Sequence, residues 1–247
     1  MNKQLSVVWI FLRTLLSYCL CAFVLIIFFC PVLFLVGILS EKKRRENKLL
    51  FWFLDRTYKG VWWAMLLPTT IKGRENIPQE PVIFVPNHES SLDIPGIGML
   101  MNGYPHIWYA LARFLKTPIL GFFVRRMCIP VNQEDARDAA KELMRGIRLV
   151  ENKPIHTIIF PEGGRWIRGQ VHDFFLGFAI IAKKTKRPVV PVLFHNLGKV
   201  YPPHSFLIWA QPVTIVIGKP FRYQEGDTDE QFCNRVRTWF ITEYEKL

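Results

Sequence analysis

The chain has few cysteines, and their positions exclude several classes of protein. Its 247 residues include 5 cysteines, and no pair has the Cys-x-x-Cys spacing of a zinc or redox site. Three of the five lie in the most apolar stretch, which favours a reducing compartment over secretion. A Gly-x-Ser-x-Gly nucleophile motif is also missing, which argues against a serine hydrolase. We therefore expect neither a metal site nor a disulfide framework.

Acidic residues are also few. The chain has 20 Asp and Glu against 32 Lys and Arg, which gives a formal net charge of +12 and indicates an anionic partner such as nucleic acid, phospholipid or a phosphorylated substrate. Residues 1–60 contain nine Lys and Arg against three Asp and Glu, so half of the excess lies in one apolar segment. Contact with anionic lipid explains this part, and no nucleic-acid-binding motif appears elsewhere. The predicted partner is a phospholipid membrane and not nucleic acid.

Charged side chains are absent from Thr14 to Leu39, a run of about 26 residues, whereas about 20 helical residues span the hydrocarbon of a bilayer. The run is longer than the apolar core of a secretory signal peptide, and no small-residue cleavage site follows it. Bulky residues precede Cys19 and Cys30, which argues against a lipoprotein signal. We therefore expect the segment to be retained in a membrane.

The flanks of this segment bear on its topology. Lys3 and Arg13 precede it and the basic run 42–45 follows, so the positive-inside rule favours both flanks on the cytoplasmic face. Pro31 and Gly37 favour a bend, and the next stretch, rich in Trp and positive charge, is typical of an interfacial helix. We predict that residues 5–39 are re-entrant or lie within one leaflet. Length alone favours a crossing, which stays the alternative.

The remainder of the chain has the pattern of an α/β domain. Short apolar runs predict strands at 82–85, 157–160, 189–194 and 213–217, and helical patterns lie between them. A helix at 134–150 is expected to bury one face, and a final helix begins at a capping box of Thr228 and Gln231. The predicted organisation is an N-terminal helical membrane-anchoring segment, 1–68, and an α/β domain with a mostly parallel central sheet flanked by helices, 69–247. The residues expected on the two buried faces are Ala136, Ala139, Ala140, Leu143, Met144, Ile147 and Val150, and then Phe232, Val236, Trp239 and Phe240.

The first candidate site follows the strand predicted at 82–85, where ligands bind in open α/β sheets. His88 and Asp93 are five residues apart, so a helix that begins near Ser90 would let Asp93 reach the imidazole. Such a carboxylate fixes one tautomer and leaves the other ring nitrogen free to accept a proton from a hydroxyl. Ser90 and Asp93 also match a capping box, so a purely structural role is the alternative.

The second candidate is the sequence Glu162-Gly163-Gly164-Arg165, with Arg168 just beyond it. Glycine lets the backbone approach a ligand closely, and an arginine binds phosphate with two parallel hydrogen bonds. A tight turn with a surface arginine explains the same residues. The third segment, Val189-Val190-Pro191-Val192, indicates by itself only a buried strand with a proline at an edge or an end.

Together, the three segments carry a more specific pattern. Asn87-His88-x-Ser90-x-x-Asp93, then Phe160-Pro161-Glu162-Gly163-x-Arg165, then the valine-rich strand, in this order, resemble the glycerolipid acyltransferase family, in particular its PlsC-like 1-acylglycerol-3-phosphate acyltransferases. The resemblance covers about residues 70–220. It implies acyl transfer from a thioester of coenzyme A or acyl carrier protein to the free hydroxyl of a lysophospholipid, giving phosphatidic acid, with no cofactor, metal or covalent intermediate.

The same resemblance implies a role for each site residue. His88 would be the general base, Asp93 would orient it, Arg165 would bind phosphate, and Glu162 would shape the site. The sequence departs from the family in having Gly164 for a threonine, Gln133 for an arginine, and Phe174-Phe175-Leu176 before Gly177 where a lysine is usual. The substitutes predicted for the missing phosphate-binding cations are Arg125, Arg126, Lys116 and Arg168. An acceptor other than lysophosphatidic acid, or a catalytically silent membrane-binding module, stays open.

Overall fold

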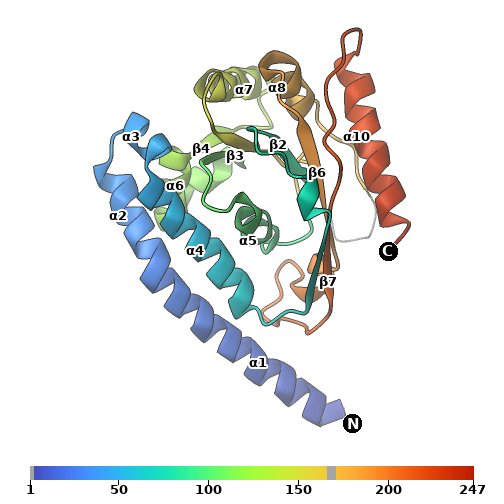
Figure 1. The fold of residues 1–247 in the computed structure, drawn as a ribbon. Helices are drawn as coiled ribbons and strands as arrows, with labels where there is room; N and C mark the ends of the chain where they lie inside the picture. Colours follow the sequence, from blue (N-terminus) through green and yellow to red (C-terminus); the bar gives the residue numbers. More distant parts are fainter. Residues whose placement is uncertain (1–2, 166–170) are drawn as a thin grey trace.

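The computed structural model describes residues 3–165 and 171–247 of the chain. Its centre is a seven-stranded sheet of order β1-β7-β6-β2-β5-β3-β4 (Figure 1). All neighbouring strands are parallel except β6 and β7, which are antiparallel. The predicted α/β class with a mostly parallel sheet is thus confirmed. The strands are β1 (Thr69–Lys72), β2 (Ile83–Pro86), β3 (His106–Leu111), β4 (Cys128–Val131), β5 (His156–Ile158), β6 (Val189–His195) and β7 (Val213–Ile217).

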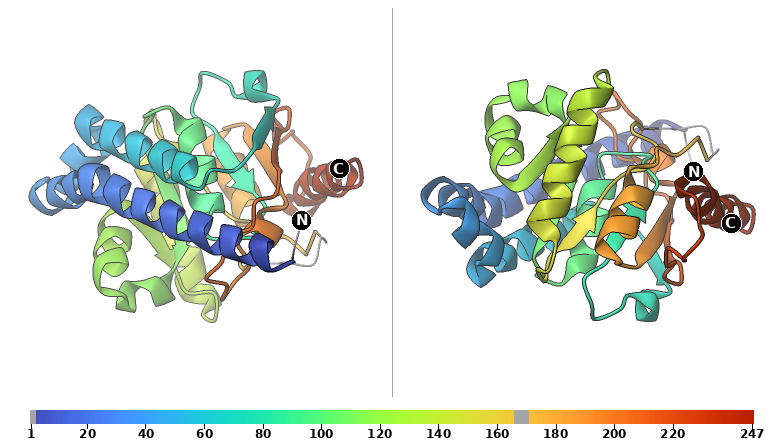
Figure 2. Two further views of the ribbon diagram at one scale, coloured as in Figure 1. Left: turned by 90° about the horizontal axis from the view of Figure 1, so that it is seen from below. Right: turned by 90° about the horizontal axis from the view of Figure 1, so that it is seen from above.

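Both faces of the sheet are covered by helices, which explains why β2 and all of β6 except its last residue are apolar. Along β2, Phe84 belongs to one buried cluster while Ile83 and Val85 belong to the other, as the two-residue period of a strand requires. One face is covered by α7 (Ala136–Val150), α8 (Gly177–Thr185) and α10 (Asp229–Tyr244). The other is covered by α5 (Asp93–Gly98), α6 (Pro118–Met127) and the N-terminal helices (Figures 1 and 2). Short helices lie at η2 (Arg74–Asn76), η3 (Met99–Met101), η4 (Ala112–Lys116) and α9 (Leu197–Val200).

The N-terminal segment is one long, nearly continuous helix. It comprises α1 (Lys3–Val24), a π-helical turn at Leu25–Phe29 and α2 (Cys30–Ile38). The π turn lies directly before Pro31, whose ring clashes with the carbonyl four residues earlier, and the N–H of Cys30 accordingly bonds to the carbonyl of Leu25. The chain therefore does not reverse within this segment. The re-entrant form predicted from Pro31 and Gly37 is wrong, because the helix accommodates the proline by widening one turn.

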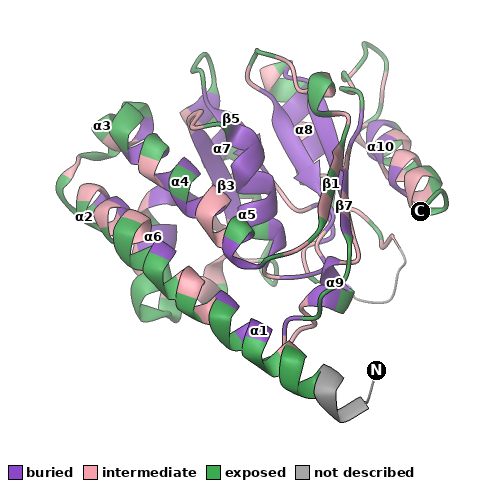
Figure 3. Ribbon diagram, turned by 60° about the horizontal axis from the view of Figure 1, so that its bottom comes forward, coloured by how far each residue is buried: buried purple, intermediate pink, exposed green. Residues whose placement is uncertain are grey.

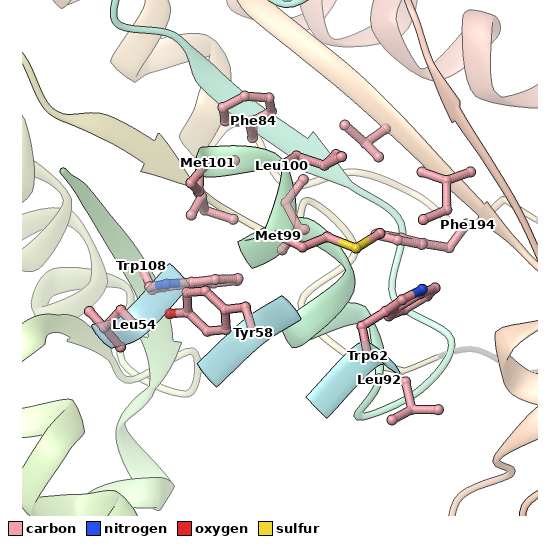
Figure 4. Close-up of a cluster of buried hydrophobic side chains, with 14 of the residues drawn as sticks. Leu54, Tyr58, Trp62, Phe84, Leu92, Met99, Leu100, Met101, Trp108 and Phe194 are labelled. Atoms are coloured by element: carbon pink, nitrogen blue, oxygen red, sulfur yellow. The ribbon is translucent and has the colours of Figure 1, made fainter. Parts of the chain in front are cut away.

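Two further helices complete the N-terminal part. They are α3 (Glu41–Glu46) and α4 (Lys48–Ala64), and α4 runs back beside α1 (Figure 2). The α4 side chains Leu54, Tyr58 and Trp62 point toward the sheet and enter the same buried cluster as Phe84 and Trp108 (Figure 4). The strands of the α/β domain begin at Thr69, next to the predicted boundary. The division into domains at 68/69 stays a prediction, and the two parts share a core.

The outer side of α1 and α2 is apolar and exposed (Figure 3). The helix between Val7 and Ile38 has a mean hydropathy of 3.1 and is long enough to cross a membrane. Its inner side contacts the α/β domain near both ends. The buried guanidinium of Arg13 donates hydrogen bonds to the carbonyls of Ile208 and Met65, and Gly37 faces Phe122 of α6. The helix therefore lies along the domain and does not project from it.

Several boundaries and faces differ from the predictions. The strand predicted at 157–160 ends at Ile158, because Phe160 has turned toward the candidate site described below. Strands β1, β3 and β4 were not predicted; they are short or contain His, Pro and Cys, which dilute the strand pattern. In α7, the predicted core residues Ala136, Ala140 and Met144 are exposed. The helix packs through a narrower strip that includes Gly146, where a Cβ would lie 2.1 Å from the hydroxyl of Tyr109. The capping box of α10 is confirmed, and of its four predicted core residues only Trp239 is partly exposed.

Candidate active site

The first candidate segment lies directly after β2, and Asn87 fixes where it begins. The Asn87 side chain donates to the carbonyl of Phe194 at 2.9 Å and accepts from the N–H of the same residue at 2.7 Å. Its amide thereby substitutes for a backbone pair and binds the end of β2 to β6. The sequence alone indicates no role for Asn87, because its partner is 107 residues away. Only the fold brings the two together.

His88 and Asp93 meet as their spacing predicted. Nδ1 of His88 lies 2.7 Å from Oδ2 of Asp93, which begins α5. The same Oδ2 accepts from the backbone N–H groups of Glu89 at 2.7 Å and Ser90 at 2.8 Å. Asp93 therefore orients the imidazole and also satisfies two backbone N–H groups. The reciprocal capping box with Ser90 is not formed, because α5 has Leu92 at its N-cap and the Ser90 hydroxyl donates to the carbonyl of Tyr201. Because Asp93 accepts at Nδ1, that nitrogen carries the proton and Nε2 has a free lone pair.

The environment of the pair differs between its two members. Asp93 is fully buried, and burial raises the pKa of its carboxyl while the contacts with His88, Ser90 and Glu89 oppose that rise. The side chain of His88 is 14% exposed, and its ring stacks on Phe160 with centroids 4.1 Å apart. Nε2 has no hydrogen-bond partner among the described residues. A buried acceptor and a partly exposed ring give an imidazole that is held on one side and accessible on the other.

Two more buried carboxyl groups lie close to the pair. Burial, together with the charges of Asp93 and Glu89, raises the pKa of Glu162 to about 8. Burial likewise raises the pKa of Glu89 to about 7, although its carboxylate accepts a 3.0 Å hydrogen bond from the N–H of Gly198. Sequence reasoning missed Glu89, because it occupies a variable position of the first motif and only its contact with α9 shows its place. The acidic cluster favours protonation of its members, since like charges at short range resist joint ionisation.

Glu162 belongs to a sharp turn after β5, the strand adjacent to β2. Gly163 has φ of +64°, and a Cβ there would lie 2.4 Å from Nε2 of Gln133 and 2.6 Å from the ring of Phe175. Nε2 of Gln133 donates to the carbonyl of Gly163 at 3.1 Å. Gln133 is therefore next to the second motif. At position 133 the family resemblance predicts an arginine. The structure places this position at the candidate site, where the chain has an uncharged amide and not a cation.

The arginines that were predicted to bind phosphate lie in different parts of the fold. Arg165 is exposed beyond the turn and makes no hydrogen bond or ion pair with any residue that the structure describes. Gly164 lies between it and Gly163, and Arg168 lies outside the described residues. Arg125 and Arg126 are in the last turn of α6, before β4, where Arg125 donates to the carbonyl of Leu115 and the Arg126 guanidinium lies over the ring of Phe122. The structure does not bring these two arginines to His88, because they precede a strand whereas the histidine follows one.

The site thus combines a base held by a buried carboxylate, a glycine turn and an arginine with no partner in the described part of the chain. All three follow the carboxyl ends of two adjacent parallel strands. This is the place where open α/β sheets bind ligands. No group of three or more His, Cys, Asp or Glu suited to a metal ion occurs among the described residues. An imidazole nitrogen without a described partner, with an arginine in the turn after the adjacent strand, suits proton abstraction from a substrate that carries an anionic group.

Comparisons with known proteins point to one family. Residues 68–195 match the model of the Acyltransferase family. The chain is 30% identical to a chloroplastic 1-acyl-sn-glycerol-3-phosphate acyltransferase of Brassica napus over 78% of its own length and 56% of the relative's, so it spans little more than half of that protein. It is 25% identical to the enzyme of the same name from Pseudomonas aeruginosa, over 87% and 82% of the two chains. The crystal structure of the 1-acyl-sn-glycerophosphate acyltransferase PlsC from Thermotoga maritima superposes with a TM-score of 0.75 at 25% identity, over 97% of both chains. The family model alone covers half of this sequence, and the chain belongs to the acyltransferase family.

Proposed function

We propose that the protein transfers a fatty acyl group from a thioester to the free hydroxyl of 1-acylglycerol-3-phosphate, forming phosphatidic acid. The observation that carries this proposal is the His88–Asp93 pair, with Nε2 of the imidazole free and the arginine turn on the adjacent strand. The names of the relatives from Brassica napus and Pseudomonas aeruginosa support the same acceptor.

The proposed reaction needs one proton transfer in each direction. Nε2 of His88 accepts the proton of the acceptor hydroxyl while the oxygen of that hydroxyl attacks the thioester carbonyl. Asp93 stabilises the imidazolium that forms. The tetrahedral intermediate collapses with cleavage of the C–S bond, and the imidazolium returns the proton to the departing thiolate. The products are an ester and a free thiol, so neither an enzyme-bound acyl group nor a redox cofactor is required. The thioester is that of coenzyme A or of acyl carrier protein, and both suit a basic protein.

The acceptor phosphate is assigned to Arg165, whose guanidinium has no partner among the described residues. A second acceptor is favoured by the groups around the turn. Gln133 and Phe175 flank Gly163, and Phe175 is 61% exposed, so the two side chains that contact this glycine are an amide and an aromatic ring without charge. Such a rim suits a lysolipid with a lower negative charge, for example lysophosphatidylglycerol or an amino-acid lipid. Arg168 stays a predicted ligand of the phosphate in either case.

The decisive experiment uses purified full-length protein, a panel of lysolipids and both thioester donors, with products identified by mass spectrometry. Phosphatidic acid as the main product supports the first acceptor, and acylated lysophosphatidylglycerol with little phosphatidic acid supports the second. His88→Ala is the control that separates enzyme-dependent product from non-enzymatic acyl transfer from the thioester. A folded wild-type protein that acylates no member of the panel would support the silent membrane-binding module instead.

The proposed location is a membrane, with the α/β domain on the cytoplasmic face and the long N-terminal helix within one leaflet. The support is that α1 and α2 contact the domain near both ends through Arg13 and Gly37, so a crossing helix would draw the domain into the bilayer. Single cysteines at Asn2 and Ser40, in a chain without the five native ones, test this with an impermeant maleimide on sealed vesicles. Labelling of the two positions from opposite sides contradicts the proposal, and labelling of both from one side supports it.

A further inference from the structure

A cavity with several charged side chains in its lining lies at the opposite ends of the strands from the catalytic pair. The pocket has a volume of about 680 Å³ and is bounded by α3, by α4 from Lys48 to Lys59, and by the loops that precede β3 and β5. His88 and Glu162 follow strands of this parallel sheet, whereas Tyr104 and Lys153 of the pocket precede strands. The pocket is therefore separate from the candidate active site, and neither the sequence motifs nor the proposed reaction uses it.

The charges around this pocket favour an anion. Five cationic side chains line it against two carboxylates, Glu46 and Asp55, which leaves a formal charge of +3. Lys59 donates a 2.9 Å hydrogen bond to Oδ2 of Asp55, while Oδ1 of the same carboxylate has no hydrogen-bond partner among the described residues. The other cations are Arg45, Lys48, Arg56 and Lys153. The ammonium groups of Lys48 and Lys153 have no ion-pair partner in the described part of the chain, and they come from segments about a hundred residues apart.

A buried donor strengthens this interpretation. Arg45 is only 6% exposed, and its Nε has no hydrogen-bond partner among the described residues. Its single side-chain hydrogen bond there is a 3.2 Å contact from Nη2 to Glu41. A buried guanidinium normally satisfies its donors, because an unpaired buried donor costs free energy. An oxyanion in the pocket would supply the missing acceptor, and phosphate matches the fork of an arginine.

The surroundings of the pocket indicate where such an anion would come from. Trp52 lies on its rim, is 44% exposed and contacts Phe28 of the apolar helix edge to face, with ring centroids 6.3 Å apart. The Arg56 guanidinium lies 5.4 Å from the centroid of the same Trp52 ring. Tryptophan and arginine side by side are typical of the headgroup level of a membrane. The pocket thus adjoins the apolar surface of α1 and α2.

We propose that this pocket binds the phosphate of an anionic phospholipid from the bilayer on which the protein lies, at a site distinct from the one that carries out acyl transfer. Arg45, Lys48 and Lys153 bind the phosphate, and Trp52 contacts the glycerol and the upper acyl chains. The proposal goes beyond the acyl transfer proposed above and does not depend on which lysolipid is the acceptor.

The test is a calorimetric titration of the full-length protein in neutral detergent with short-chain phosphatidylglycerol. The variant K48Q/K153Q removes two exposed cations of the pocket, and K42Q/K43Q removes the same charge from exposed lysines of α3 that do not line it. We expect saturable binding in which the pocket variant raises Kd at least about tenfold, as loss of charge-assisted hydrogen bonds predicts. The control variant should change Kd less than about twofold, because exposed charges are screened by solvent.

Three outcomes would overturn the proposal. Equal losses in the two variants would indicate diffuse surface attraction, and equal affinity for phosphatidylcholine would show that anionic charge is not recognised. Inorganic phosphate bound as tightly as the lipid would assign the pocket to a soluble phosphate. Acyl transfer by K48Q/K153Q in the same detergent is expected to stay within about twofold of wild type, since exposed charges outside the site have small effects. Failure of the lipid site and failure of the acyltransferase assignment are therefore distinguishable.

Discussion

Histidines occur at both ends of the parallel strands, which form two opposite edges of the sheet, and the environments of these histidines differ. At the carboxyl ends of the strands, His88 is partly exposed and contacts a buried carboxylate. At the opposite edge, His106 and His156 are paired across β3 and β5 and are both buried. Burial lowers the pKa of His106 to about 4 and that of His156 to about 3. The first histidine is arranged to accept a proton, and the other two are held neutral.

The hydrogen bonds of the buried pair explain this difference. Nδ1 of His156 accepts from the N–H of Val82 at 3.0 Å, and Nδ1 of His106 lies 2.9 Å from the carbonyl of Tyr104. Neither ring has a carboxylate as its direct partner among the described hydrogen bonds, so nothing there repays the desolvation of an imidazolium. Burial alone makes a histidine a structural element. A buried acid on one side and an accessible nitrogen on the other make it a candidate base.

Removal of the base is expected to have the largest effect. His88→Ala should lower kcat by about 10²–10⁴, the usual contribution of a general base, while the fold persists because its ring is partly exposed. Asp93→Asn should lower kcat more than it raises KM, since it changes the tautomer and not the shape of the site. Steady-state kinetics and circular dichroism check both. If the alanine variant keeps more than about a tenth of the wild-type rate, the segment has only its capping role.

Arg165→Ala is expected to act on binding and not on proton transfer. Loss of a charge-assisted hydrogen bond to phosphate costs about 1.5–3 kcal/mol, so the acceptor KM should rise roughly 10- to 150-fold. Arg165→Lys should recover only part of this, because an ammonium group cannot make two parallel hydrogen bonds. Arg74→Ala, at another exposed arginine, is the matched control and should leave KM unchanged. An unchanged KM in Arg165→Ala would show that another cation binds the acceptor phosphate.

The contrast between the edges also shows how far the sequence could predict this molecule. Strand β7 has the predicted limits, Val213–Ile217, and α10 begins at its predicted cap, because alternation and capping are local signals. The His88–Asp93 contact was predictable for the same reason, since it spans five residues. Short-range sequence patterns predict short-range contacts, and the candidate base lies in a segment that has such a pattern.

Contacts between distant segments were beyond that reasoning. Gln133 reaches the carbonyl of Gly163 and Glu89 reaches the N–H of Gly198, and neither pair leaves a periodic signal in the sequence. The basic pair Arg125 and Arg126 was expected near the phosphate from charge alone, yet its helix precedes β4 and so ends at the other edge. The burial of His106 and His156 could not be predicted from the sequence either. Their neutrality follows from strand pairing and not from their neighbours in the chain.

The acidic cluster near His88 predicts an alkaline limit for acceptor binding. Glu162, whose pKa is raised to about 8, is protonated at neutral pH and ionises above that value. The new negative charge should repel the acceptor phosphate, so KM should rise by up to about tenfold per pH unit above pH 8. Glu162→Gln should remove this rise while keeping a side chain of the same size. If the glutamine variant shows the same alkaline rise, another group is responsible.

The buried histidines predict a smaller effect, on stability in acid. Because the folded-state pKa of His156, about 3, lies below its ordinary value of 6.5, the unfolded chain binds a proton that the folded chain does not. The contribution of His156 to the free energy of unfolding is therefore fully present above pH 6.5. It should be lost as the pH falls from 6.5 toward 3, by up to about 1.4 kcal/mol per pH unit. His156→Asn keeps an acceptor for the N–H of Val82 but cannot titrate, so its free energy of unfolding should depend less steeply on pH. Urea unfolding at pH 7 and pH 5 measures both slopes, and the comparison of slopes cancels any loss of packing in the variant. Equal slopes would mean that His156 is protonated within the fold, and the distinction between the two edges of the sheet would then rest on His106 alone.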